Sequence, residues 1–216
     1  MRLNMKKMWR ENKSFIIFIA LMLVFRSAVA DWNDVPTGSM KPTIVEGDRI
    51  YVDKLAYDIN IPFVGYSVYK LNDPKTNDII IFNSIKADKR LVKRVIGVPG
   101  DIVSLKNNKL VINGKAVTYH DEVNKQGVSI LTELLSTNGH RIQVTENQAP
   151  YSSFPSVKVP ENHYLVLGDN RDNSADSRVI GFVPRNEIIG RTNKVILSLD
   201  YENYFLPRLN RFFKDI

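Results

Sequence analysis

The sequence predicts a mainly β protein that is preceded by one hydrophobic helix. The only strongly apolar stretch lies near the N-terminus, at residues 15–25. From Asp48 onward, short β-branched runs are bounded by Gly, Pro, Asn and Asp, which is typical of strands joined by turns. No long helical period follows the apolar stretch, and only residues 129–136 suggest a short helix.

Composition limits the domain count and the partners. The chain has 216 residues, 44% of them hydrophobic and 25% charged, which suits one globular domain with or without a small insertion. The formal net charge is +7; residues 1–13 carry five cations and Glu11, a local net of +4 that leaves +3 for the rest. We therefore expect no nucleic-acid partner. Without cysteine there is no disulfide, thiol nucleophile or thiolate metal site.

Residues 1–30 permit two interpretations. A basic head, a short apolar run and Ala28-Val29-Ala30 form the pattern of a cleavable secretory signal. A retained anchor is the alternative, although residues 15–30 would span only about 24 Å as a helix, against a hydrocarbon core of ~30 Å. Arg26 favours the anchor, because a cleavage region prefers small neutral residues; Trp9 and Trp32 would then mark the two interfaces.

We accordingly expect residues 14–32 to be a transmembrane anchor. The basic flank at residues 1–13 should stay cytoplasmic, which places the remainder in a periplasm or at the cell exterior. The alternative, cleavage after Ala30, would export the same remainder. Ser39 follows Ala30 by nine residues, so even an extended chain keeps it within about 30 Å of the membrane.

The predicted strands fall in two core segments, residues 33–114 and 161–200. Between them, residues 115–160 lose their apolar periodicity and are expected to form a small inserted subdomain. The tail at residues 201–216 mixes aromatic and basic side chains, which suits a membrane interface or, equally, packing on the domain. The expected strands are residues 49–53, 78–83, 89–96, 101–105, 110–112, 164–167 and 188–199.

Ser39, in the stretch from Pro36 to Thr43, is our candidate nucleophile. A serine hydroxyl needs a base to activate it and donors for the developing oxyanion. A histidine base receives no support, since the G-x-S-x-G pattern is absent. The three histidines are scattered and are expected on the surface or in turns: His120, His140 and His163.

A lysine in the strand at residues 89–96 is the alternative base. Burial can lower a lysine pKa by several units, so that the amine is neutral at working pH. Lys93 and its neighbour Arg94 would lie on opposite faces of this strand. The periodicity leaves open which cation is buried, but only the lysine could act as a base, because arginine stays protonated.

The third unusual stretch runs from Gly168 to Arg178, directly after a predicted strand. Its many small polar groups indicate a tight loop held by side-chain to backbone hydrogen bonds. A calcium loop is a poor fit: counting from Asp169, an arginine stands at the third ligand place and Ile180 at that of the bidentate carboxylate. A plain surface turn is the other alternative.

Together these three stretches resemble the type I signal peptidases, membrane-anchored serine proteases with a Ser-Lys dyad. Ser39-Met40-Lys41-Pro42-Thr43 is similar to the family's nucleophile box, residues 93–101 to its lysine box, and residues 168–178 to its third signature. The resemblance, from about residue 15 to 191, implies a coiled antiparallel β-sheet catalytic domain of signal-peptidase/LexA type. It also implies that no metal or cofactor is needed.

The resemblance also assigns roles in the reaction. Ser39 is similar to the nucleophile and Lys93 to the general base, while Ser174 would form a hydrogen bond that aims the lysine amine. The Thr37 hydroxyl and the Ser39 backbone N–H would form the oxyanion hole. Asp176 and Arg178 are similar to a structural ion pair. Shallow pockets for small substrate residues would be lined by five apolar side chains: Val35, Met40, Ile44, Leu91 and Val92.

The expected activity is removal of N-terminal signal peptides from exported preproteins after a small-x-small motif, at the bacterial cytoplasmic membrane. The expected partners are these preproteins and the lipid bilayer. One departure is that residues 115–160 are short compared with two-anchor members and only one anchor is visible, which leaves preprotein specificity open.

Four alternatives stay open at this point. A specialised relative could process one pilin or conjugative-transfer substrate with the same dyad. Self-cleaving repressors use related chemistry but need a DNA-binding helical domain, where this chain is hydrophobic. A penicillin-binding interpretation could start from the S-x-x-K match at Ser67, but no Ser-Asp-Asn or Lys-Thr-Gly accompanies it. The last is an anchored binding module with a dead active site.

Overall fold

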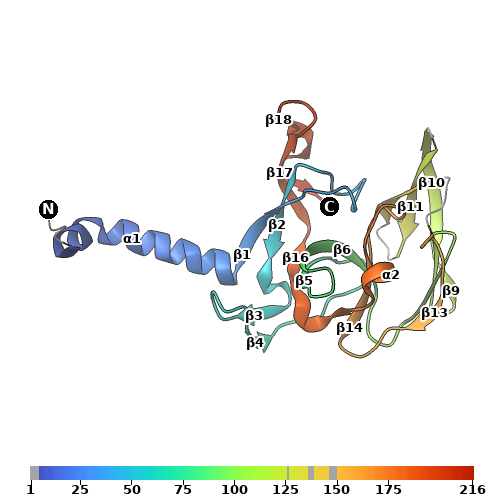
Figure 1. The fold of residues 1–216 in the computed structure, drawn as a ribbon, viewed down its shortest axis with the longest axis horizontal. Coiled ribbons are helices and arrows are strands. Elements are labelled where there is room, and N and C mark those ends of the chain that lie inside the picture. Colours follow the sequence, from blue (N-terminus) through green and yellow to red (C-terminus); the bar gives the residue numbers. More distant parts are fainter. Residues whose placement is uncertain (1–4, 126, 136–138, 146–149) are drawn as a thin grey trace.

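A long helix projects from a β-rich body in the computed structural model of the chain (Figure 1). The structure describes residues 5–125, 127–135, 139–145 and 150–216. The helix is α1 (Met5–Ala28), and a second, short helix is α2 (Ser177–Ile180). Three turns of 3-10 helix complete the helical elements of the described chain: η1 (Lys54–Ala56), η2 (Arg185–Glu187) and η3 (Leu209–Arg211).

The largest sheet of the described chain has ten strands and carries most of the predicted core strands, but those expected at residues 101–105 and 110–112 lie in a smaller sheet. Its order is β15-β14-β6-β5-β16-β2-β17-β18, with β1 beside β2 and β19 beside β17. These strands are β1 (Ala30–Asp34), β2 (Asp48–Asp53), β5 (Ile79–Ser84), β6 (Lys89–Gly97), β14 (His163–Leu167), β15 (Val183–Pro184), β16 (Ile188–Thr192), β17 (Lys194–Asp200), β18 (Leu206–Pro207) and β19 (Lys214–Asp215).

Three smaller sheets surround it. The first contains β13 (Phe154–Lys158), β7 (Ile102–Lys106), β8 (Lys109–Ile112) and β9 (Lys115–Ala116). The second contains β10 (Thr118–Lys125), β11 (Val128–Leu134) and β12 (His140–Thr145), and the third pairs β3 (Asp58–Asn60) with β4 (Ser67–Lys70). The ladders within these sheets and the main sheet are antiparallel, which confirms the predicted mainly β, antiparallel class.

Two predicted elements are wrong. The short helix expected at residues 129–136 is the strand β11, because its residues pair with both β10 and β12; residue 136 lies outside the described residues. The single strand expected at residues 188–199 is divided at Asn193 into β16 and β17. These two strands flank opposite edges of β2, so the chain must change sides between them. An apolar pattern does not encode that change.

The predicted anchor at residues 14–32 is wrong at its C-terminal end. Helix α1 stops at Ala28, and Ala30 to Trp32 belong to β1, because they pair with Tyr51 to Asp53 of β2. The large apolar side chains from Phe15 to Phe25 of α1 are exposed to solvent. Among the described residues, no helix combines the length and apolarity that crossing a membrane requires.

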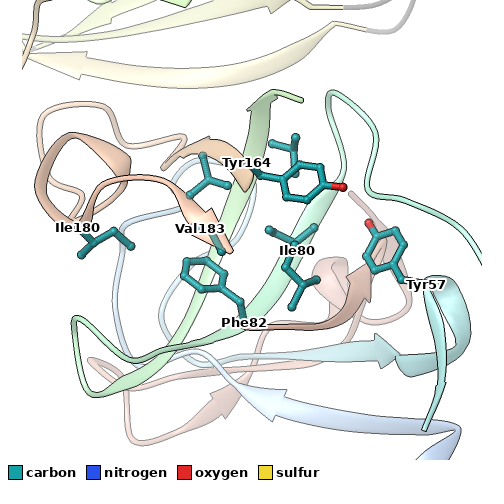
Figure 2. Packing of buried hydrophobic residues seen from close by; sticks show 9 residues of the cluster. Tyr57, Ile80, Phe82, Tyr164, Ile180 and Val183 are labelled. Carbon is teal, nitrogen blue, oxygen red and sulfur yellow. The ribbon is translucent and has the colours of Figure 1, made fainter. Parts of the chain in front are cut away.

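The main sheet has apolar cores on both of its faces. Successive side chains of β5 alternate between them: Ile79 and Ile81 pack with residues of β2 and β17, whereas Ile80 and Phe82 pack with Tyr164 and its neighbours (Figure 2). This alternation follows from the two-residue repeat of a strand. It buries β5 and the second half of β6 at the centre of the body.

The segment at residues 115–160 contributes to two of the smaller sheets. β9 and β13 pair with β8 and β7, while β10, β11 and β12 form the sheet at the end of the body opposite α1 (Figure 1). The C-terminal residues run back along β17 through β18 and β19. Arg211 in this part forms an ion pair with buried Asp48 at 2.5 Å, so its backbone is fixed to the main sheet.

Candidate active site

Ser39 lies in a tight turn that its apolar neighbours anchor. The turn is closed by hydrogen bonds from Lys41 N to Gly38 O at 3.1 Å and from Ile44 N to Met40 O at 3.0 Å. Met40 and Ile44 are fully buried against β2 and β5. Two buried residues directly after Ser39 therefore fix the turn, while Ser39 itself remains partly exposed.

Lys93 of β6 meets Ser39 directly. Its Nζ lies 2.6 Å from Ser39 Oγ and 3.0 Å from the carbonyl oxygen of Val92. The side chain is 2% exposed, and among the described residues no carboxylate lies within ion-pair distance of it. Burial lowers the pKa of Lys93 to about 8, which the more distant Asp176 and Asp169 only partly offset. A pKa near 8 leaves this amine mostly charged at pH 7, half neutral at pH 8 and mostly neutral at more alkaline pH.

The polar loop from Gly168 to Arg178 clamps the serine turn from the other side. Asn170 donates twice to it, from its backbone N to Ser39 O at 3.1 Å and from Nδ2 to Gly38 O at 3.0 Å. A Cβ at Gly168 would collide with Ser39 O and Ser174 Oγ, so this close approach requires glycine. The position of the nucleophile thus depends on a loop more than 120 residues further along the chain.

Ser174 lies in the same cleft as Ser39 and Lys93. Its Oγ is buried and has no hydrogen-bond partner among the residues the structure describes. The structure therefore brings Ser174 to the site without forming the bond to the lysine amine that we expected. A buried hydroxyl without a partner is free to form one when the side chains or a substrate move.

Asp176 and Arg178 organise the end of this loop. Their side chains pair at 2.7 Å, and Asp176 also accepts a hydrogen bond from Gly168 N at 2.9 Å. Arg178 donates to the carbonyl oxygens of Arg171, at 2.5 Å, and Tyr151, at 3.1 Å. Because both partners of the pair are almost completely buried and further bonded, their geometry is well defined.

An open cleft of about 710 Å³ contains Thr37, Ser39, Lys93 and Ser174. Thr37 is exposed on its wall. All five apolar residues expected to bind substrate line this cleft, but they differ in exposure: Val35, Met40 and Ile44 belong to the core and form its floor, whereas Leu91 and Val92 are half-buried. The cleft extends past Arg90 to Trp32.

The open side of β6 borders this cleft. β14 pairs with β6 only from Arg94 to Gly97, so within the described chain the edge at Leu91 to Lys93 carries no strand on that side. An extended peptide could therefore add to this edge with its backbone close to Ser39 Oγ. The arrangement suits nucleophilic attack by the serine on a peptide carbonyl, with the adjacent amine as base.

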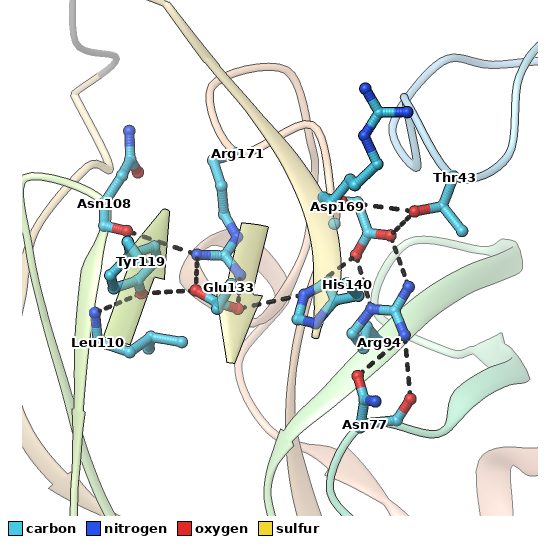
Figure 3. Close-up of polar contacts among 12 residues, drawn as sticks. Thr43, Asn77, Arg94, Asn108, Leu110, Tyr119, Glu133, His140, Asp169 and Arg171 are labelled. Atoms are coloured by element: carbon cyan, nitrogen blue, oxygen red, sulfur yellow. Dashed lines mark hydrogen bonds and ion pairs between the residues drawn. The ribbon is translucent and has the colours of Figure 1, made fainter. Parts of the chain in front are cut away.

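A buried cluster of alternating charges connects β6 to the polar loop at residues 168–178 (Figure 3). Arg94 donates from Nε and Nη2 to the two carboxylate oxygens of Asp169 at 2.9 and 2.8 Å. Asp169 also accepts from Thr43 Oγ1 at 2.5 Å, and Asp169 is the neighbour of Asn170 in the clamp. Arg94 beside it lowers the pKa of this carboxyl against the effect of burial.

His140 and Glu133 extend this cluster toward the sheet of β10, β11 and β12. The expectation that His140 lies on the surface or in a turn is wrong: it is buried between Glu133, 3.2 Å away, and Asp169, 4.0 Å away. Glu133 is held in turn by Arg171 at 2.5 Å. Burial is possible because each carboxylate here has an arginine partner.

Sequence reasoning missed Asn170, Thr43 and Glu133 as supports of the site. The polar composition of the loop predicted side-chain to backbone bonds, but not that Asn170 would bond a segment 132 residues away. No local pattern signals such a contact. It follows only from the packing of the three stretches.

Comparison with known proteins places the chain among signal peptidases. The profile described as "Signal peptidase, peptidase S26" matches residues 8–197. The chain is similar to signal peptidase I of Pseudomonas fluorescens, at 35% identity over 87% of this chain and 72% of the relative. It is also similar to signal peptidase I of Pseudomonas aeruginosa, at 33% identity over 93% of this chain and 76% of the relative.

Among solved structures, the chain is similar to a signal peptidase I of Enterococcus faecalis. The identity is 31%, the match covers 56% of this chain and 97% of the other, and the TM-score is 0.37.

Proposed function

Since the chain belongs to the signal peptidase family, peptidase S26, and is a serine endopeptidase of that family, we propose that it removes N-terminal signal peptides from exported preproteins with a Ser39–Lys93 dyad. The observation that carries the proposal is the 2.6 Å contact between Ser39 Oγ and buried Lys93 Nζ. Cleavage after a small-x-small motif is what membership of the family implies for this cleft, which Met40 and Ile44 line.

The reaction begins with proton transfer from Ser39 to neutral Lys93. As Oγ attacks the scissile carbonyl carbon, its proton moves to Nζ and the carbonyl electrons move to the oxygen. The Thr37 hydroxyl and the Ser39 backbone N–H stabilise this oxyanion. Collapse breaks the C–N bond, the Lys93 ammonium protonates the departing amine, and the signal peptide stays as an ester on Ser39.

Hydrolysis of the ester completes the cycle. Lys93, neutral again, takes a proton from a water that attacks the ester carbonyl, and then returns that proton to Ser39 Oγ. The role of Ser174 is to bond the lysine amine during these transfers and keep it aimed at Oγ. In this scheme the Asp176–Arg178 pair fixes the loop that carries Ser174.

We further propose that α1 attaches the enzyme to the bacterial cytoplasmic membrane, with residues 1–13 on the cytoplasmic side and the β body on the other. The support is the run from Phe15 to Phe25, whose large side chains are exposed and lack a protein cover in the described chain. A helix that is apolar all round needs an apolar environment. Substrate signal peptides in the same bilayer would present their cleavage junction close to Ser39.

The test is cleavage of a purified preprotein by the full chain in detergent, with N-terminal sequencing of the product. Ser39→Ala should abolish cleavage, and a serine-directed acylating probe should no longer label the protein. Ser67→Ala is the matched control: Ser67 lies on the exposed strand β4, where it donates to Asp58 at 3.1 Å, and its loss should change nothing. Full activity of Ser39→Ala, or loss of activity in Ser67→Ala alone, would refute the dyad.

A panel of preproteins separates the general enzyme from a specialised one. Cleavage of several unrelated preproteins supports a general signal peptidase, whereas cleavage of one pilin-type or transfer-type substrate alone supports a dedicated peptidase with the same dyad. A wild-type chain that cleaves none and takes no acyl label at Ser39 would be a binding module instead.

A further inference from the structure

A second apolar surface lies outside the cleft, on the hairpin formed by β3 and β4. Residues 59–69, here named the apolar hairpin, contain no charged side chain. Its large apolar residues are exposed on both strands and on the connecting turn: Ile59, Ile61, Phe63, Val64, Tyr66, Val68 and Tyr69. Contiguous exposed apolar surface of this kind marks an interaction site.

The apolar hairpin touches the end of α1. The backbone N of Phe63 donates to Ser27 Oγ at 2.6 Å. Lys54, which precedes the hairpin, donates from Nζ to the carbonyl oxygens of Arg26 at 2.7 Å and Ser27 at 3.2 Å, and so caps the helix. Figure 1 shows β3 and β4 beside the junction of α1 and β1. The hairpin thus lies beside the end of α1, at Ser27, two residues beyond the end of the exposed apolar run at Phe25.

The turn displays its side chains at a conformational cost. Ile61 N bonds Tyr66 O at 2.9 Å, which closes the turn, and Phe63 has a φ of 66°, a left-handed conformation that bulky residues rarely adopt. Phe63 is 70% and Val64 71% exposed. Strain that persists to hold apolar side chains outward points to a function for them.

We propose that the apolar hairpin inserts into the interface of a phospholipid bilayer beside α1, as a second point of membrane contact. The inference rests on the proposed membrane attachment of α1. β4 is exposed on both of its faces, whereas β3 is fixed to the body through buried Asp58; an exposed outer strand of this kind suits immersion in lipid better than docking on a flat protein surface. Tyr66 and Tyr69 combine an apolar ring with a polar tip, as side chains at membrane interfaces do.

A single membrane contact, through α1, would let the β body rotate relative to the bilayer. A second contact, through the hairpin, fixes its orientation. With α1 across the bilayer and the hairpin in its interface, the cleft between Trp32 and Ser39 is held at a fixed angle to the membrane. A signal peptide emerging from the bilayer would then meet the cleft in one orientation. The hairpin itself takes no part in the chemistry.

The test uses the absence of native cysteine. Single variants of the full chain, Val64→Cys, Leu21→Cys and Val123→Cys, carry an environment-sensitive nitrobenzoxadiazole label and are reconstituted in vesicles of three parts phosphatidylcholine to one part phosphatidylglycerol. Val123 is the matched control, an exposed valine on β10 at the opposite end of the body. Lipids with a nitroxide on the acyl chain should quench the labels at Val64 and Leu21 but not the label at Val123.

The three labels together separate the hairpin proposal from the proposed membrane attachment of α1. If the Val64 label is quenched no more than the Val123 label while the Leu21 label is quenched, the hairpin proposal is wrong and the attachment of α1 stands. If neither Val64 nor Leu21 is quenched, both proposals fail. Cleavage measured on the same samples tests the enzymatic function independently, because the labelled positions lie outside the cleft.

A charge in the hairpin gives a second test. Val64→Asp should lower the rate of cleavage of a vesicle-inserted preprotein about fivefold, the equivalent of ~1 kcal/mol, and leave cleavage of a short soluble peptide unchanged. Val123→Asp should change neither rate. An unchanged rate on the inserted preprotein, or an equal loss on both substrates, would overturn the proposal.

Discussion

Two neighbouring residues of β6 show how this protein treats buried cations in opposite ways. Lys93 and Arg94 are both buried, at 2% and 3% exposure, although strand alternation points them in different directions. Arg94 binds both oxygens of Asp169, whereas Lys93 meets a serine hydroxyl and a carbonyl. The strand therefore carries a salt bridge on one face and, on the other, an amine whose charged form is destabilised by burial.

The difference separates structural from reactive charge. Removing an ion from water costs several kcal/mol unless a counter-ion compensates. Arg94 is compensated, so it remains charged and ties β6 to the loop that clamps Ser39 through Asn170. Lys93 is not, and its lowered pKa is the property that a general base requires. The pairing of one cation supports the reactivity of the other.

The largest expected effect comes from replacing Lys93 by arginine, the residue type of its neighbour Arg94. Lys93→Arg keeps the charge but cannot supply a neutral base, so we expect kcat for preprotein cleavage to fall at least ~10³-fold. The reciprocal variant, Arg94→Lys, should keep measurable cleavage, because it leaves the dyad intact. Comparable activity in the two variants would show that the proposed contrast is false.

Breaking the ion pair between Arg94 and Asp169 should mainly lower the stability of the folded protein. Asp169→Leu leaves Arg94 buried without a counter-ion, although its bonds to Asn77 remain, and should lower the free energy of unfolding by about 3–5 kcal/mol. The double variant Arg94→Met with Asp169→Leu should recover a large part of that loss, as urea unfolding of the detergent-solubilised chain would show. If the double variant is less stable than Asp169→Leu, the pair does not act as a unit.

Loss of the Thr37 hydroxyl, the proposed side-chain donor to the oxyanion, tests the catalytic site without changing the Arg94–Asp169 ion pair. Thr37→Val removes the hydroxyl at nearly constant volume and should cost about 2.7–4 kcal/mol of transition-state stabilisation, mainly in kcat. Thr37→Ser, which keeps the hydroxyl, is the matched control and should retain near-normal activity. Equal kcat values for the valine and serine variants would remove Thr37 from the oxyanion hole.

The smallest expected effect is a pH-dependent gain of stability. The Lys93 pKa, about 8 when folded, lies below its ordinary value of 10.5, so the unfolded chain binds more protons between these pH values. The penalty for burying the charge is therefore full below pH 8, shrinks as pH rises, and is gone above 10.5.

Lys93→Met should accordingly stabilise the protein at pH 7 by about 2 kcal/mol, after ~1 kcal/mol is subtracted for the lost bond to Ser39. The gain should vanish near pH 10.5 in urea unfolding. Lys106→Met, at an exposed end of β7, is the control and should change stability little at either pH. A gain that is equal at both pH values would mean that Lys93 is not a costly buried charge.

Strands and turns were predictable from sequence wherever packing is local. β5 followed from its β-branched run, since a strand buried on both faces is apolar over most of its length, and β6 followed from its β-branched residues and the turn after it. β11 was missed because its pairing with β10 and β12 determines its structure, not its own periodicity. The division between β16 and β17 depends on which edges of β2 they occupy, a property of the sheet as a whole.

The candidate site was predictable in its parts but not in its support. Ser39 and Lys93 could be named because their chemistry restricts the choice of residue. The sequence did not show which of the two cations of β6 is buried, and in the structure both Lys93 and Arg94 are buried. His140 was placed on the surface because nothing nearby in sequence predicts its position between Glu133 and Asp169. Contacts of this kind join segments that only the fold brings together.

A direct titration of Lys93 tests the central claim. The full chain, labelled with [ε-¹³C]lysine, would be followed by NMR from pH 6 to 11, and the Lys93 resonance would be assigned by its absence from Lys93→Arg. We predict one lysine that titrates near pH 8, within about one unit, while ordinary lysines titrate above 10. A Lys93 resonance that titrates above pH 10 would contradict its role as the neutral base for Ser39.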